Sequence, residues 1–223
     1  AARSENWLDF VGTHATKYKD AKCFASCWWN KKSYSFAADY YSWFYRRTHE
    51  SADALSTNST LLVRAPLRQF AYQACTNGVD ASVRPATAAE AKLWPKTDVA
   101  VETWSSLGLH NHMGSMRYRT EVEIPSIPAG KPLRIWVAST DGGLAAWCNG
   151  KRLKGWSEKA PGDHTPDKPG DFPGWFGRPV LFDATGVLRP GKNVLDFYAT
   201  RGQGPNEIGT GGIMGPVTIF AEK

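Results

Sequence analysis

Residues 118–124 read Tyr-Arg-Thr-Glu-Val-Glu-Ile, residues 133–138 read Leu-Arg-Ile-Trp-Val-Ala, and residues 144–150 read Leu-Ala-Ala-Trp-Cys-Asn-Gly. In the first stretch, tyrosine, threonine, valine and isoleucine alternate with arginine and glutamate, which is the two-residue period of a strand with one buried face. The second stretch alternates in the same way. The third ends in Asn149-Gly150, a pair that suits the positive φ angles of a tight hairpin turn. These residues therefore predict three strands.

Further strands are expected on both sides of these three. Short apolar or alternating runs, separated by turn residues, occur at 61–63, 69–75, 98–104, 179–182, 194–199 and 216–221. The alanine-rich residues 87–93 predict one short helical turn, and the proline- and glycine-rich residues 154–177 predict a long loop. A total of about eight or nine short strands, joined by loops of unequal length, predicts an all-β jelly-roll sandwich.

The composition is that of a globular protein with a substantial core. Of the 223 residues, 42% are hydrophobic and 22% are charged. No run approaches the roughly 18 consecutive apolar residues of a membrane-spanning helix, so no membrane span is expected. The chain begins at Ala1-Ala2 without an initiator methionine, which fits a processed protein or an excised fragment.

Residues 1–57 are expected to form an N-terminal extension, and residues 58–223 the sandwich. The extension is rich in aromatic residues, which predicts that it packs on the sandwich or on a partner rather than staying disordered. Its lysines and arginines supply much of the net charge of +6, and basic residues interleaved with aromatic ones are typical of single-strand binders. No RNA-recognition or helix-turn-helix pattern is present, however, so we expect no nucleic-acid partner.

The four cysteines are Cys23, Cys27, Cys75 and Cys148, and they allow three disulfide pairings in an oxidising compartment. The sequence does not choose among these pairings or show that any forms. The spacing of Cys23 and Cys27 would suit half of a zinc site, but the chain offers no second closely spaced pair, so no metal is expected there. Cys148 is in phase with Leu144 on its strand and is expected in the core.

The order of short motifs along residues 95–221 resembles the galactose-binding-like jelly roll. More narrowly, it is similar to the sugar-binding domain of family 2 glycoside hydrolases and to related accessory domains of bacterial polysaccharide-degrading enzymes. Two positions depart from the usual form of the family, because Cys148 stands where valine is usual and Ala184 where valine or isoleucine is usual. Both changes keep the strands apolar. The motifs are Tyr118-Arg119-Thr120, Trp147-Cys148-Asn149-Gly150-Lys151, Phe182-Asp183-Ala184-Thr185, Pro190-Gly191-x-Asn193 and Gly211-Gly212-Ile213-Met214-Gly215-Pro216-Val217.

The resemblance implies a carbohydrate-binding or accessory role without catalysis, in a secreted or periplasmic setting. In those hydrolases the catalytic carboxylates lie on a separate barrel domain, and nothing in this chain has the length or alternation of a barrel. The implied partners are an oligo- or polysaccharide and, alternatively, a protein such as a catalytic domain. No cofactor is expected, and a structural calcium ion is not indicated. Family members of this fold bind sugar or only pack on a catalytic domain, so function has to be argued from the site.

A sugar site needs flat aromatic faces and planar polar groups. The loop 154–177 supplies both, and the loop before the last strand supplies further polar groups. Two structural alternatives stay open: Phe172, Trp175 and Phe176 could instead cap the core, and Glu207 could pair with Arg201. The expected ligand-binding residues are Trp156, Asp163, His164, Asp171, Trp175, Arg201, Asn206 and Glu207.

Two other functions compete with this hypothesis. One is a small glycoside hydrolase or polysaccharide lyase that uses His110, His112, His164 and the loop carboxylates, although no catalytic residue is assigned. A metal on His110 and His112 would need a third ligand, such as Asp141, that only the fold could supply. The other is a structural or assembly subunit that docks through its aromatic N-terminal segment.

The carboxylates Glu121 and Glu123 stand two residues apart on one strand and would suit paired acid–base chemistry. They share their strand face with Arg117 and Arg119. Opposite charges on one face of a strand balance each other. We therefore predict a solvated, charge-balanced surface here rather than a catalytic pair.

Overall fold

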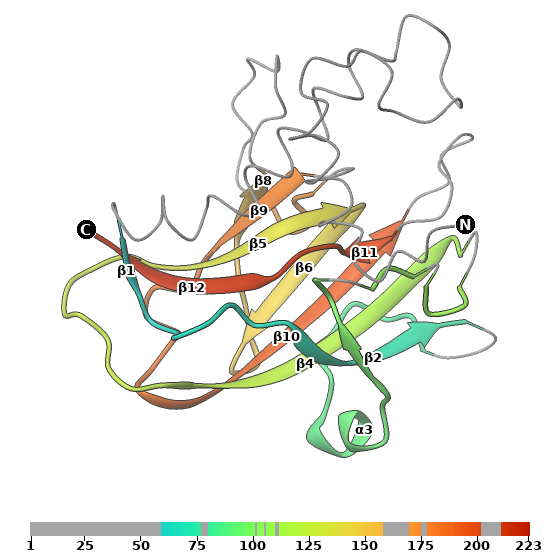
Figure 1. Cartoon of the computed structure of the whole chain (residues 1–223), viewed down its shortest axis with the longest axis horizontal. Helices are drawn as coiled ribbons and strands as arrows, with labels where there is room; N and C mark the ends of the chain where they lie inside the picture. Colours follow the sequence, from blue (N-terminus) through green and yellow to red (C-terminus); the bar gives the residue numbers. More distant parts are fainter. Residues whose placement is uncertain are drawn as a thin grey trace, which may run out of the picture.

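Two antiparallel sheets face each other across a common core in the computed structural model, which describes residues 59–76, 80–100, 102–104, 106–109, 112–157, 170–174, 178–201 and 211–223 (Figure 1). Within these ranges each sheet has six strands. The first sheet has the order β1 (Ser59–Leu61), β12 (Val217–Glu222), β5 (Leu133–Asp141), β9 (Arg178–Asp183) and β8 (Gly155–Ser157), and β11 (Gly212–Ile213) also pairs with β5. The second has the order β3 (Lys96–Asp98), β2 (Gln69–Cys75), β4 (Gly114–Ile124), β10 (Gly191–Arg201), β6 (Gly143–Cys148) and β7 (Lys151–Arg152). The predicted all-β sandwich is confirmed.

The core lies between the sheets and follows the alternation seen in the sequence. On β4, the side chains of Met116, Tyr118, Val122 and Ile124 are buried and face the core. Aromatic rings in the core meet edge to face, as Phe70 does with Tyr118 at 6.5 Å between ring centroids. Such apolar side chains contribute about 1.5–3 kcal/mol each when fully buried, so the two inner faces supply most of the stability.

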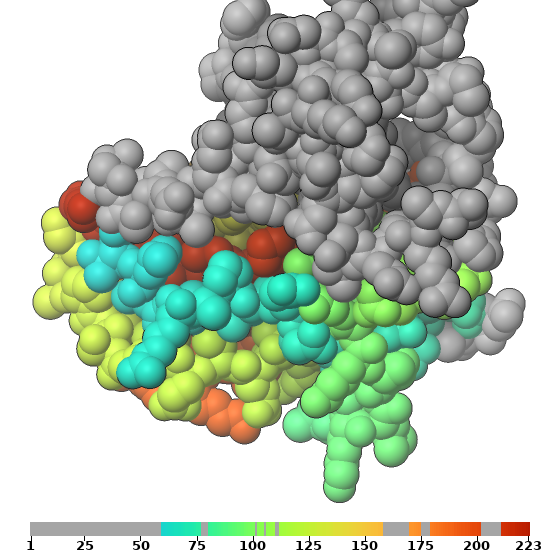
Figure 2. Space-filling model, in the orientation of Figure 1, coloured from blue at the N-terminus to red at the C-terminus, as the bar shows by residue number. Residues whose placement is uncertain are grey.

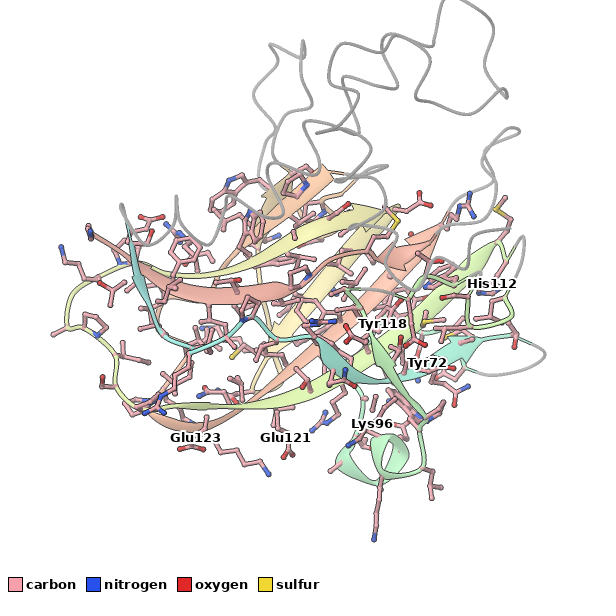
Figure 3. All side chains as sticks on the ribbon, viewed as in Figure 1. Tyr72, Lys96, His112, Tyr118, Glu121 and Glu123 are labelled. Atoms are coloured by element: carbon pink, nitrogen blue, oxygen red, sulfur yellow. The ribbon has the colours of Figure 1, made fainter. Side chains whose placement is uncertain are left out.

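The expected charge-balanced surface on β4 is only half correct. Glu121 and Glu123 are exposed and point away from the sandwich (Figure 3). Arg117 and Arg119, in contrast, are covered by the chain at 80–92: Arg117 Nη2 donates to the main-chain oxygen of Asp80 (2.6 Å) and Arg119 Nη1 to that of Ala86 (2.6 Å). The two arginines are covered, unlike the two glutamates, because a segment more than 30 residues away in the sequence packs over them. The alternation of residues along β4 gives no sign of this packing.

The covering segment contains the short helix α3 (Ala88–Lys92), which confirms the helical turn expected at 87–93. Thr87 caps the helix through its side chain, and the Glu90 carboxylate accepts from the main-chain nitrogen of Thr87 in return. Arg84 pairs with Glu90 and so ties the incoming chain to the helix. In the space-filling view this green segment projects from the body of the sandwich (Figure 2).

Two sequence-based boundaries were wrong. The strand expected at 98–104 ends at Asp98, because the Glu102 carboxylate accepts from the main-chain nitrogen of Asp98 (2.8 Å) and from Thr97 Oγ1 (2.8 Å), which turns the chain. The loop expected at 154–177 contains the strand β8, which pairs with β9 at the edge of the first sheet. The run of turn residues in this segment concealed a three-residue strand.

The outward face of the first sheet is partly apolar. Trp136 and Phe220 point away from the core, yet they are only 3% and 5% exposed and cluster with Ala138 and Leu181. The extension proposed for residues 1–57 lies outside the described residues, so its packing and the domain boundary stay predictions. In the described part of the chain, no helix is long and apolar enough to cross a membrane.

Cys148 lies on the inner face of β6 and is fully buried, which confirms its expected place in the core. Burial raises the pKa of its thiol to about 12. At pH 8 only about one in 10⁴ of these thiols would be ionised, and the thiolate is the reactive form. We expect N-ethylmaleimide to leave Cys148 unmodified in the native protein and to modify it in urea, as measured by peptide mass spectrometry. Rapid native modification of Cys148 would contradict this burial.

Candidate functional site

The segments that carry most of the expected ligand residues begin and end at one end of the sandwich. At this end β10 finishes at Arg201, paired with Gly114 at the start of β4. A Cβ on Gly174 would lie 2.5 Å from the main-chain oxygen of Gly142, so the chain at 174 packs directly on the turn between β5 and β6. Gly174 also donates its main-chain N–H to Ser157 Oγ.

Five of the expected ligand residues lie outside the described residues, but the chain connects them to this end. Trp175 follows Gly174 directly, and the connection that holds Asn206 and Glu207 leaves from Arg201. The connection from Ser157 to Gly170 holds Asp163 and His164. The roles of all five stay predictions.

Arg201, one of the expected ligand residues, is buried within the sandwich. Its Nε lies 3.7 Å from Oδ2 of Asp141, and both side chains are almost completely inaccessible to solvent. Pairing Arg201 within the protein was one of the alternatives left open by the sequence, with Glu207 as the partner. The structure pairs it with Asp141, whereas Glu207 lies outside the described residues. The charge of Arg201 is balanced inside the fold.

Trp156 lies on β8, on the outward face of the first sheet, in the same row as Leu181 and Trp136. Its ring is half-buried, and the guanidinium of Arg134 lies 5.5 Å from the ring centroid. Arg134 also pairs with Asp183 (2.6 Å), which fixes the cation beside the ring. A cation at this distance from an indole face is a stabilising contact, so part of the Trp156 face is occupied by the protein.

Asp171, another expected ligand residue, is exposed and belongs to an aromatic and basic cluster on the outward face of the second sheet. The guanidinium of Arg152 lies between two rings, 4.3 Å from the centroid of Trp147 and 5.0 Å from that of Phe172. Phe172 meets Tyr198 edge to face at 6.3 Å between centroids. We name this cluster the Phe172 surface, defined by Trp147, Arg152, Lys154, Asp171, Phe172 and Tyr198.

Phe172 is the ring of this surface that solvent reaches. It is 41% exposed, whereas Trp147 and Tyr198 are 6% and 5% exposed. The alternative that Phe172 caps the core is therefore wrong. Its ring is held from beneath by Arg152 and Tyr198, and the main-chain oxygen of the next residue, Pro173, accepts from the nitrogen of Leu144 (2.8 Å).

Both cations of the Phe172 surface, Lys154 and Arg152, bind Asp171. Lys154 Nζ lies 2.5 Å from Asp171 Oδ1, and this hydrogen bond holds the pKa of the Asp171 carboxyl below its ordinary value. Arg152 Nη2 donates instead to the main-chain oxygen of Asp171 (2.5 Å). Partial burial lowers the pKa of Arg152. Exposed ring, cation and carboxylate thus lie side by side, the combination a sugar ring and its hydroxyls require.

The sequence-based site omitted Arg152 and Trp147, although one signal for them was present. The hairpin turn at 149–150 was predicted, and a two-residue turn at that point places Trp147 opposite Arg152, as the register of β6 and β7 has it. The contact of Phe172 with Arg152 could not be predicted in this way, because a long connection separates the two residues in the sequence.

Of the three histidines named for the hydrolase or lyase alternative, the structure describes only His112. His112 packs its ring on Trp104 at 5.0 Å between centroids, and its Nε2 lies 3.3 Å from the main-chain oxygen of Ser115. Trp104 Nε1 donates to the hydroxyl of Tyr118 (2.7 Å), and burial raises the pKa of that hydroxyl. Among the described residues, no three His, Cys, Asp or Glu side chains gather as metal ligands would. Figure 3 places His112 at the end of the sandwich where β4 begins.

Comparisons with known proteins give similarity only at the level of solved structures. No protein-family model and no curated protein matches the chain. Similar structures include a putative beta-galactosidase from Bacteroides fragilis, with 14% identity and a TM-score of 0.48 over 74% of this chain and 23% of that chain. A family 2 glycosyl hydrolase from Bacteroides cellulosilyticus has 13% identity and a TM-score of 0.49 over 69% of this chain and 20% of that one.

A beta-glucuronidase from Ruminococcus gnavus is similar in the same way, with 15% identity and a TM-score of 0.48 over 74% of this chain and 29% of that chain. The chain thus spans less than a third of the length of these enzymes. The observed fold is a two-sheet antiparallel sandwich.

Proposed function

We propose that the chain is a non-catalytic carbohydrate-binding or accessory sandwich of a polysaccharide-degrading system, acting in a secreted or periplasmic setting. The observation that carries the proposal is the Phe172 surface, where a solvent-exposed ring is fixed by Arg152 and flanked by the Asp171 carboxylate. An exposed aromatic ring covers the apolar face of a sugar, and the neighbouring polar groups pair with its hydroxyls. The connections that carry the other expected ligand residues begin or end next to the turn between β5 and β6.

The rival hydrolase or lyase is less well supported by the described residues. His112 is engaged with Trp104 and Ser115, and Glu121 pairs with Lys192 on an exposed surface. Assays for new reducing ends or unsaturated products would test the rival directly. Product release by the purified chain would replace the accessory role with an enzymatic one.

Affinity electrophoresis through gels that contain plant or algal polysaccharides tests the proposed binding. We expect Phe172→Ala to weaken retention of the chain by about 5-fold or more, because stacking on an aromatic ring is worth about 1 kcal/mol beyond the apolar area that it buries. Trp156→Ala and Trp175→Ala test the remaining expected aromatic contacts in the same gels.

Leu93→Ala is the matched control, because Leu93 is also an exposed apolar side chain, at 86%, but lies next to α3. Its retention should equal that of the wild type. Equal retention of the Phe172→Ala and wild-type chains on every polysaccharide that retards the wild type would contradict the proposed site.

A further inference from the structure

Arg152, at the centre of the Phe172 surface, forms no salt bridge with a carboxylate of the described residues, although the nearby Asp171 carboxylate attracts it. Its Nη2 donates to a main-chain oxygen, while the nearby Asp171 carboxylate is bound by Lys154 Nζ at 2.5 Å. Its Nε is buried without a hydrogen-bond partner. Buried N–H groups of charged side chains that lack partners are costly. A ligand cannot reach the buried Nε, so an anion would pair with the guanidinium through Nη1.

The position of this cation is fixed by its neighbours. The guanidinium carbon lies over both the Trp147 ring, at 4.3 Å from its centroid, and the Phe172 ring, at 5.0 Å. The remaining nitrogen, Nη1, makes no hydrogen bond to the described residues and is not fully buried. Lys154, 65% exposed, lies on the other side of Asp171. Two cations and one carboxylate leave this surface with one net positive charge.

We propose that the Phe172 surface selects acidic glycans, in which a uronate carboxylate or a sulfate ester pairs with Arg152 and Lys154 while the sugar ring lies on Phe172. The proposal rests on the proposed carbohydrate-binding function and specifies its ligand class. Planar guanidinium groups pair well with oxyanions. The net charge of +6 on the whole chain would favour the approach of an acidic polymer.

The decisive comparison uses one polymer in two forms. Gels contain either polygalacturonate or the same polymer with its carboxylates reduced to primary alcohols, so the backbone is kept and the charge removed. We expect the wild-type chain to be retained about 10-fold or more strongly by the acidic form. A hydrogen bond to a charged group contributes about 1.4 kcal/mol more than a neutral one, and this difference is a tenfold change in affinity. Dextran sulfate against dextran separates sulfate from carboxylate as the recognised anion.

Two substitutions within the surface should act in opposite directions. Arg152→Gln should abolish the preference for the acidic polymer, because it should lower retention by the acidic polymer more than retention by the reduced polymer. Asp171→Asn should strengthen retention by the acidic polymer, because it removes the one carboxylate of the surface. If Arg152→Gln unfolds, which thermal unfolding reports, Lys154→Gln replaces it because Lys154 is mostly exposed.

A charge-matched control separates site binding from general attraction to a polyanion. Lys131→Gln removes one exposed positive charge on the connection between β4 and β5. It should lower acidic retention much less than Arg152→Gln does. Equal losses for the two variants, or equal retention of the wild type by the acidic and reduced polymers, would overturn the acidic specificity. Absence of retention by every glycan would instead overturn the proposed carbohydrate-binding function.

Discussion

Replacing Asp196 with asparagine is expected to lower the free energy of unfolding by about 3–5 kcal/mol, the range for breaking one partner out of a buried ion pair. Arg119 Nη1 lies 2.8 Å from Asp196 Oδ1, and the two side chains are 14% and 4% exposed. Burial raises the pKa of Asp196 above its ordinary value despite the attraction of Arg119. The pair is thus formed at a desolvation cost, and removing the Asp196 charge leaves the Arg119 guanidinium with the main-chain oxygen of Ala86 as an acceptor but without its paired carboxylate.

Urea unfolding followed by circular dichroism measures this effect. Glu121→Gln is the control, because its pair with Lys192 lies on the surface with side chains 52% and 62% exposed, and such pairs contribute about 0–1 kcal/mol. The double replacement Arg119→Met with Asp196→Leu should recover most of the loss, since no charge is then left buried. A loss below about 1 kcal/mol for Asp196→Asn would contradict the pairing.

Alanine at Gly142 should be the second severe change, because the turn between β5 and β6 leaves no room for a side chain. The φ angle of Gly142 is +99°, and a Cβ there would lie 2.0 Å from the main-chain oxygen of Thr200. The left-handed conformation costs about 1–2 kcal/mol for a residue with a Cβ, and overpacking against backbone adds about 1–3 kcal/mol. We expect a total loss of about 2–5 kcal/mol.

Gly130→Ala separates the two causes, because Gly130 has a φ angle of +69° but no atom within 4 Å of its would-be Cβ. It should show only the conformational cost. Differential scanning calorimetry reports both variants, and about 2–4 °C of melting temperature corresponds to each kcal/mol in a chain of this size. Equal shifts for the two variants would show that the contact with Thr200 is unimportant.

The strands could be predicted where one sheet face is buried by the opposite sheet. On β4 and β5 the alternation of apolar and polar residues is local, and the Asn149-Gly150 turn fixes the register of the following hairpin. The failures arose where a distant segment decides the environment. Arg117 is 3% exposed because the chain near residue 80 covers it, and the alternation around Val99 is overridden by the hydrogen bonds of Glu102.

The candidate site could be predicted only in part for the same reason. The loop that contains Asp171 was expected from the sequence to supply polar and aromatic groups, and in the structure Asp171 and Phe172 are exposed. Phe172 contacts Arg152 on β7 and Tyr198 on β10. These contacts are long-range, and the alternation of residues along the sequence does not predict them. Arg152 therefore became visible as a partner of Phe172 only in the fold.

The most direct test of the account is an NMR titration of the ¹⁵N-labelled chain with an acidic oligosaccharide, followed at the backbone amides and at the Nε–H of arginine side chains. The account predicts that the largest shifts occur at Arg152, at Lys154 and along residues 170–174, and that Phe172→Ala removes them. Saturable binding whose shifts fall elsewhere, with Arg152 and residues 170–174 unaffected, would contradict it.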